Sequence, residues 1–71
     1  MLDGFVTIDG VKYYYKNGSC PAPGVIFVDG DYYYVNWNGV VVVNQKFYVS
    51  NGNGYTIPMT YTFDADGKII G

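Results

Sequence analysis

The chain has 71 residues, which limits it to one small domain, because a chain of this size buries only about 60% of the surface that its unfolded form exposes. Charged residues make up 14% and aromatic residues 20%, nine of them tyrosines, so tyrosine rings must cover surface that Lys and Glu usually cover. The formal net charge of −2 gives no electrostatic footprint for nucleic acid or for anionic membranes.

Neither end of the sequence nor its cysteine content points to a membrane or disulfide-bonded protein. No apolar run approaches the roughly 20 residues that span a bilayer. Met1-Leu2-Asp3 lacks the basic start of a signal peptide, so the signal of an exported parent protein is expected outside this chain. The single cysteine, Cys20, excludes an internal disulfide and leaves two alternatives, an incidental loop thiol or an intermolecular bridge.

The predicted elements are short β-strands at residues 5–8, 11–16, 25–28, 31–36, 40–43, 46–50, 60–63 and 68–70. Asp9-Gly10 and Asp29-Gly30 separate strand pairs with strong hairpin-turn chemistry, and Asn44-Gln45 takes the same place in a third pair with weaker chemistry. The proline-containing residues 19–24 connect the first pair to the second. Residues 55–59 are either an insertion or a short edge strand interrupted by proline.

Internal repetition indicates tandem units. A shift of 20 residues aligns residues 4–10 with 24–30, and the pattern Asn/Asp-x-Asn/Asp-Gly recurs at residues 36–39, 51–54 and 64–67. We predict an all-β chain of three to four antiparallel hairpins, solenoid-like or a meander, with units of about 4–23, 24–38, 39–54 and 55–71. Strands 25–28 and 40–43 are apolar on both faces, so neighbouring hairpins or another chain should cover both sides.

The units resemble the cell-wall-binding repeats of bacterial surface proteins, which include choline-binding modules and glucan-binding repeats. Residues 28–39, VDGDYYYVNWNG, fit the second half of the family pattern position for position; residues 8–18 fit with one residue missing, and residues 61–67 fit its tail. This resemblance implies tandem hairpins, a location outside the cell on a bacterial surface or secreted protein, and a binding role without catalysis.

The sequence departs from the family at the rings that build choline sites between successive hairpins. The position of the first tryptophan holds Phe5, Val25 and Val40, and the position of the second holds Lys12, Tyr32 and Phe47. A bound cation needs aromatic faces within about 6 Å, so two valines and a lysine argue against an intact choline site.

Surplus aromatic rings are the predicted binding surface, for sugar faces or for a partner protein. Trp37 lies in a turn where the other copies have Gly52 and Ala65, so it is either an exposed anchor or a ring folded back over a strand. Successive strand residues face opposite sides, which places Tyr32 and Tyr34 on one face. The predicted ligand-binding residues are Trp37, Tyr32, Tyr34, Tyr14, Phe47 and Tyr48.

The sequence gives little support to catalysis or metal binding. It has no histidine, and its aspartates are mostly in predicted turns. Asp64-Ala65-Asp66-Gly67 is similar to the start of a calcium loop but lacks the closing glutamate. We therefore predict a non-enzymatic module without cofactor or metal that binds cell-wall or extracellular polysaccharide. The alternative is a structural spacer or protein-interaction repeat that packs against neighbouring repeats or self-associates.

Overall fold

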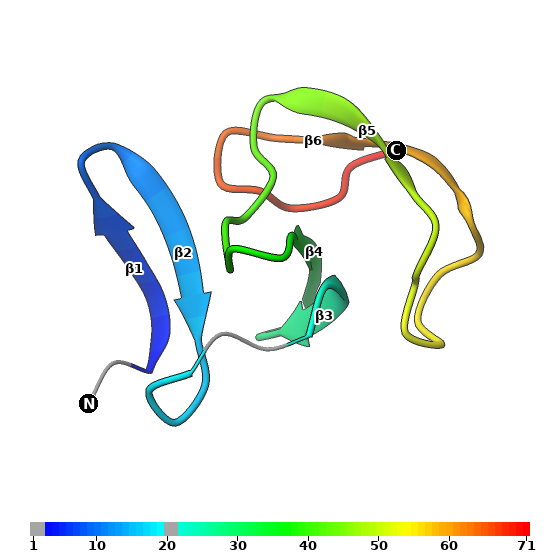
Figure 1. Ribbon diagram of the computed structural model, residues 1–71. Helices are drawn as coiled ribbons and strands as arrows, with labels where there is room; N and C mark the ends of the chain where they lie inside the picture. The colour runs from blue at the N-terminus through cyan, green and yellow to red at the C-terminus, as the bar shows by residue number, and fades with distance from the viewer. Residues whose placement is uncertain (1–2, 20–21) are drawn as a thin grey trace.

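The computed structural model describes residues 3–19 and 22–71, and these form six strands and no helix. The strands pair antiparallel in three two-stranded sheets, β1–β2, β3–β4 and β5–β6 (Figure 1). Their bounds are β1 Gly4–Ile8, β2 Val11–Tyr15, β3 Gly24–Val28, β4 Asp31–Val35, β5 Gln45–Val49 and β6 Met59–Phe63. The predicted fold of tandem antiparallel hairpins is confirmed. Met1, Leu2, Cys20 and Pro21 lie outside the described residues, and with them the alternatives for Cys20.

The turns of the first two hairpins have the geometry that their sequences predict. Asp9 and Gly10 have φ angles of 51° and 78°, and Asp29 and Gly30 have φ angles of 49° and 86°. Positive φ at both central residues is the type I′ turn, whose twist matches that of the strands it joins. A two-residue turn also fixes the register, which places Phe27 of β3 opposite Tyr32 of β4.

The predicted pairing of residues 40–43 with 46–50 is wrong. β5 pairs instead with β6, with Phe47 opposite Tyr61, across a loop of residues 50–58. The hairpin therefore crosses the unit boundary predicted between residues 54 and 55. Asn44-Gln45 lacks the glycine that a type I′ turn favours, so no tight turn forms there. Residues 55–58 lie in the loop, as the insertion alternative predicts.

Residues 40–43 form single bridges rather than a strand, as do residues 68–70. Val40 bridges to Tyr13 and Val41 to Val35, while Ile69 bridges to Phe63. Each segment follows one of the predicted Asn/Asp turns. The Asn36 side-chain oxygen accepts hydrogen bonds from the amides of residues 38 and 40, and the Asp64 carboxylate accepts from those of residues 66 and 68. These turns fold the chain back against its own hairpin.

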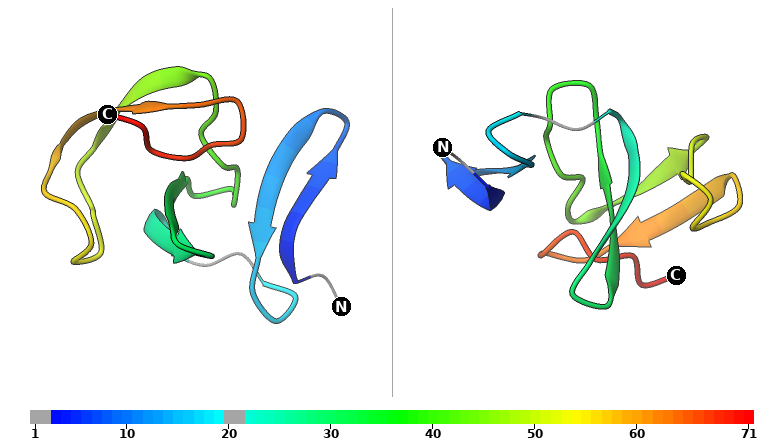
Figure 2. Two further views of the ribbon diagram at one scale, coloured as in Figure 1. Left: turned by 180° about the vertical axis from the view of Figure 1, so that it is seen from behind. Right: turned by 90° about the horizontal axis from the view of Figure 1, so that it is seen from below.

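The segments after the second and third hairpins also reach the preceding hairpin, and they do so in the same way. The Val41 amide donates to the Lys12 carbonyl at 2.9 Å, and the Ile69 amide donates to the Tyr32 carbonyl at 2.9 Å. Lys12 and Tyr32 hold equivalent places in β2 and β4, so the bonds repeat from one unit to the next. The connecting segments thus join successive hairpins, which lie one after another along the molecule (Figure 2).

Two small clusters of buried side chains fill the junctions. One contains Tyr33, Val35 and Val41, and the other contains Val25, Val42, Val49 and Phe63. The predicted covering of strands 25–28 and 40–43 is confirmed for the valines in these clusters. It is wrong for Phe27, which is 48% exposed.

No helix in residues 3–19 and 22–71 is long and apolar enough to cross a membrane. The turn after β6 packs tightly against the segment that follows the second hairpin. Gly67 has a φ of 91°, and a Cβ atom there would lie 2.6 Å from Val41 Cγ1 and 3.0 Å from the Val42 oxygen. The turn after β6 therefore approaches the connecting segment too closely for any side chain.

We predict that Gly67→Ala destabilises the protein more than Gly10→Ala. Both glycines have positive φ, so both substitutions carry a left-handed backbone cost of about 1–2 kcal/mol. Only Gly67 is enclosed, since a Cβ at Gly10 meets nothing within 4 Å. Overpacking at Gly67 should add about 1–3 kcal/mol to the loss in free energy of unfolding, measured by urea denaturation. Equal losses in the two variants would contradict this close approach.

Candidate functional site

Three exposed rings contact one another at the turn end of the second hairpin. The ring centroids lie 4.9 Å apart for Phe27 and Tyr32, 5.8 Å for Tyr32 and Tyr55, and 6.1 Å for Phe27 and Tyr55. These separations are those of packed aromatic pairs. Phe27 is 48% exposed, Tyr32 37% and Tyr55 52%. The three rings, called here the exposed ring cluster, therefore form one continuous aromatic surface open to solvent.

The hairpin register explains why two of these rings meet. Val25 and Tyr34 are opposite one another, as are Phe27 and Tyr32, and side chains two residues apart share a face. The face is buried at Val25, in the junction with the third hairpin. It becomes exposed toward the Asp29-Gly30 turn, beyond the reach of that junction, so the same apolar face supplies both core and surface.

The β5–β6 loop brings the third ring, Tyr55, to the other two. The Asn51 carbonyl accepts a hydrogen bond from the Val25 amide at 3.2 Å, and Asn53 Nδ2 donates to the Val25 carbonyl at 2.7 Å. Gly24 permits this approach, since a Cβ there would lie 2.5 Å from Asn53 Nδ2. The loop is thus fastened along β3, and Tyr55 follows directly from the turn at Asn53 and Gly54.

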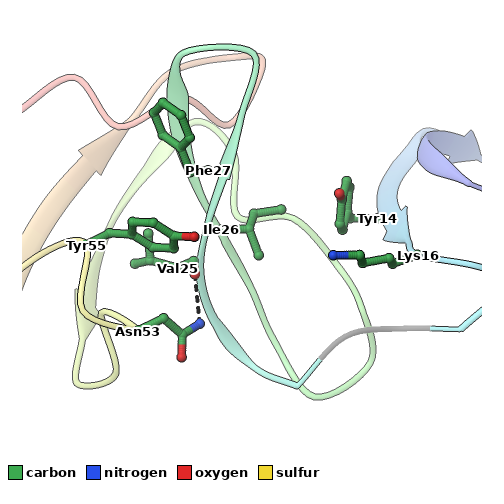
Figure 3. Close-up of a pocket in the computed structure, with 7 residues that line it drawn as sticks. All are labelled: Tyr14, Lys16, Val25, Ile26, Phe27, Asn53 and Tyr55. Carbon is green, nitrogen blue, oxygen red and sulfur yellow. Dashed lines mark hydrogen bonds between the residues drawn. The ribbon is translucent and has the colours of Figure 1, made fainter.

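A pocket of about 270 Å³ adjoins the cluster (Figure 3). Its lining comes from three places: hairpin one, β3 and the β5–β6 loop. Figure 3 shows Tyr14 and Lys16 on one side, Ile26 between, and Phe27, Tyr55 and Asn53 on the other. Ring faces beside an ammonium and an amide are suited to a ligand with both apolar faces and hydroxyl groups.

The predicted binding residues do not form one site. Tyr32 lies in the exposed ring cluster and Tyr14 in the adjoining pocket. Tyr34 and Phe47 instead pack together at 4.9 Å against the buried cluster around Val25. Tyr48 is exposed on β5, away from these contacts.

Trp37 is exposed and lies outside the pocket. Its side chain is 85% exposed in the turn at residues 36–39, so the alternative in which it folds back over a strand is wrong. It remains a candidate anchor, separate from the exposed ring cluster.

The aromatic and polar residues Phe27, Tyr55, Lys16 and Asn53 belong to the site but are not among the residues predicted from the sequence. The signal for Phe27 was present, because an Asp-Gly turn at residues 29–30 places it opposite Tyr32. The others depend on a loop bending back to another hairpin and on the docking of hairpin one, for which short-range sequence patterns give no signal.

The ring positions between successive hairpins do not form open cages in this chain. At the first junction Phe5 and Tyr33 are 4.7 Å apart, and the Lys12 ammonium lies 4.4 Å from the Phe5 centroid. At the second junction the counterpart of Phe5 is Val25, which is fully buried in the core. In residues 3–19 and 22–71, no three His, Cys, Asp or Glu side chains gather to hold a metal ion.

Two ionisable groups beside the first junction have shifted pKa values. Burial raises the pKa of the Tyr33 hydroxyl, and the Lys68 ammonium partly opposes that rise. The Asp31 carboxylate raises the pKa of Lys68, with which it forms an ion pair at 3.6 Å.

The fold is that of a module of tandem antiparallel β-hairpins. The choline-binding domain of Spr1274 from Streptococcus pneumoniae has a similar structure, with a TM-score of 0.74 and 28% sequence identity over 100% of this chain and 97% of that domain. This match confirms the resemblance to the bacterial cell-wall-binding repeats, the group that includes choline-binding modules. No family model matches the sequence, and no curated protein matches it either.

We predict that stability falls at alkaline pH partly through Tyr33. The native state binds the Tyr33 proton more tightly than the unfolded chain does, because the pKa is raised in the folded state. Its contribution is complete below the ordinary tyrosine pKa of about 10 and is lost as pH rises through the raised value. Urea denaturation from about pH 8 to 12 should show a shallower alkaline loss for Tyr33→Phe than for wild type. The exposed-ring control Tyr48→Phe should follow wild type, and a Tyr33→Phe curve parallel to wild type would contradict this assignment.

Proposed function

We propose that this chain is a non-catalytic binding module of a bacterial surface or secreted protein, and that it recognises cell-wall or extracellular polysaccharide. The structural match to a binding domain supports a binding role. The observation that carries the proposal is the exposed ring cluster, Phe27, Tyr32 and Tyr55, beside a pocket with a lysine and an asparagine.

The exposed ring cluster leaves apolar surface in water that so small a protein could otherwise bury in its core. A 71-residue chain has little apolar area to spare for its core, yet three mutually packed rings face solvent. Contiguous apolar surface with a polar rim is typical of binding sites. The apolar C–H face of a pyranose ring can stack on the face of one of these rings, while Lys16 and Asn53, which line the adjoining pocket, can bond its hydroxyl groups.

Quaternary ammonium is the less suitable ligand for this chain. The similar domain of Spr1274 is described as choline-binding. In the present chain the equivalent ring positions at the two junctions hold Lys12 and Val25, so one contains a cation already and the other is closed by core packing. A neutral sugar surface therefore fits the exposed rings better than choline fits the junctions.

The glycan proposal predicts binding that depends on the exposed ring cluster. Titration with purified cell-wall glycans should shift the NMR signals of Phe27, Tyr32 and Tyr55, and Tyr55→Ala should weaken binding at least tenfold, about 1.4 kcal/mol. Tyr48→Ala removes an equally exposed ring elsewhere and should leave the affinity unchanged. The fluorescence of Trp37 reports separately whether the turn at residues 36–39 takes part. No response to a broad glycan panel would rule out the proposal.

A second candidate function is that of a structural spacer that packs against neighbouring repeats or a second copy. Exposed apolar side chains on the third hairpin, its loop and the following segment favour it: Tyr48, Ile57, Met59 and Ile70. Exposed apolar surface of this kind is buried when chains associate.

The spacer function predicts concentration-dependent association. Sedimentation velocity should show dimers or larger species as concentration rises, and Ile57→Ser with Ile70→Ser should reduce them. The matched variant Ile8→Ser removes an exposed isoleucine on hairpin one and should have no such effect. A monomer at every concentration would exclude self-association.

A further inference from the structure

We propose that the junction between the first two hairpins is an ammonium-binding site and that its occupant is the protein's own Lys12. The proposal does not depend on glycan binding, which involves other residues. It concerns how hairpin one is held to the rest of the molecule.

Three separate parts of the chain meet the Lys12 ammonium. Nζ lies 4.4 Å from the centroid of Phe5 on β1 and 5.5 Å from that of Tyr33 on β4. It also donates a hydrogen bond of 2.7 Å to the carbonyl oxygen of Asp66, in the turn after β6. Both rings are within the roughly 6 Å at which a cation is attracted to an aromatic face. Two ring faces and one acceptor thus contact the ammonium from three separate parts of the chain.

Hydrogen bonds hold both Lys12 and its acceptor in place. The Lys12 carbonyl accepts from the Val41 amide, which fixes this part of β2 to the segment after the second hairpin. Asp66 belongs to the turn organised by the Asp64 carboxylate, which accepts the Asp66 amide at 2.9 Å. The lysine side chain thus reaches from hairpin one to the turn that follows β6, the last strand of hairpin three.

The second junction shows what replaces the ammonium when it is absent. The backbone bond from Ile69 to Tyr32 corresponds to that from Val41 to Lys12, so Tyr32 is the counterpart of Lys12. The counterpart of Phe5 is Val25, which is fully buried with Val42, Val49 and Phe63. The second junction is therefore joined by apolar packing, whereas the first has a tethered cation between rings in addition to the buried cluster of Tyr33, Val35 and Val41.

Truncation of Lys12 should leave an empty site for a small free ammonium. A primary alkylammonium supplies both the charge for the two rings and a donor for the Asp66 carbonyl. A quaternary ammonium supplies the charge alone, since it has no N–H to donate. The site therefore predicts a preference for primary over quaternary ammonium ions.

Chemical rescue tests this site. Lys12→Ala should lower the melting temperature by about 4–8 °C, and millimolar n-butylammonium should restore part of the loss, with tetramethylammonium less effective. Wild type and Lys46→Ala, which removes an exposed lysine of β5, should not respond. Phe5→Leu combined with Lys12→Ala should abolish the rescue. Equal effects of butylammonium on all variants would overturn the proposal.

NMR of the wild-type protein gives a test that does not depend on the variant folding. Protons above an aromatic face are shifted upfield, so the ε-methylene protons of Lys12 should resonate upfield of those of Lys46. They should return to the Lys46 position in Phe5→Leu. Coincident ε-methylene signals in wild type would overturn the proposal even if Lys12→Ala fails to fold.

Discussion

The structure depends on satisfying the backbone of two-stranded hairpins, which are marginally stable alone because each strand leaves one edge unpaired. Short segments after the second and third hairpins meet this requirement. The Asn36 and Asp64 turns fold them back, and their amides donate to the carbonyls of Lys12 and Tyr32 in the preceding hairpin. The chain therefore gains cohesion between units from main-chain bonds as well as from side-chain packing. Buried side chains then fill the space that these bonds define.

The core and the proposed binding surface lie at two ends of the same strands. In β3, Val25 is buried at the junction, while Phe27, two residues along on the same face, is open to solvent. Such continuity explains the high aromatic content, because rings suit both a thin core and an exposed face. It also explains why the junctions have no open ring cages: the rings there are packed against valines or around Lys12. The family resemblance therefore extends to the fold more closely than to the choline positions.

Local chemistry made the hairpins predictable, whereas long-range contacts made the site unpredictable. Asp9-Gly10 and Asp29-Gly30 specify turn type and register, and the Asn/Asp turns at residues 36–39 and 64–67 followed from their side chains. The strand pairing predicted for the third hairpin was wrong because the apolar residues 40–43 fit a connecting segment as well as they fit a strand. Tyr34 and Phe47, two of the predicted ligand-binding residues, are half-buried against each other, since the sequence around a ring does not reveal which hairpin will cover it. Tyr55 reaches Phe27 because Asn51 and Asn53 bond to the carbonyls of Pro23 and Val25, each 28 residues earlier in the chain. No local sequence pattern encodes that return.

The loop at residues 50–58 affects how many pockets of this kind a longer array of hairpin repeats would contain. The pocket takes its walls from hairpin one, β3 and this loop, so three consecutive units cooperate to make a single recess. Added copies that lack the loop segment Asn51-Gly52-Asn53-Gly54-Tyr55 would add hairpins without adding pockets of this kind. If the pocket binds glycan as proposed, this loop rather than the hairpin would set how many ligands an array holds at such pockets.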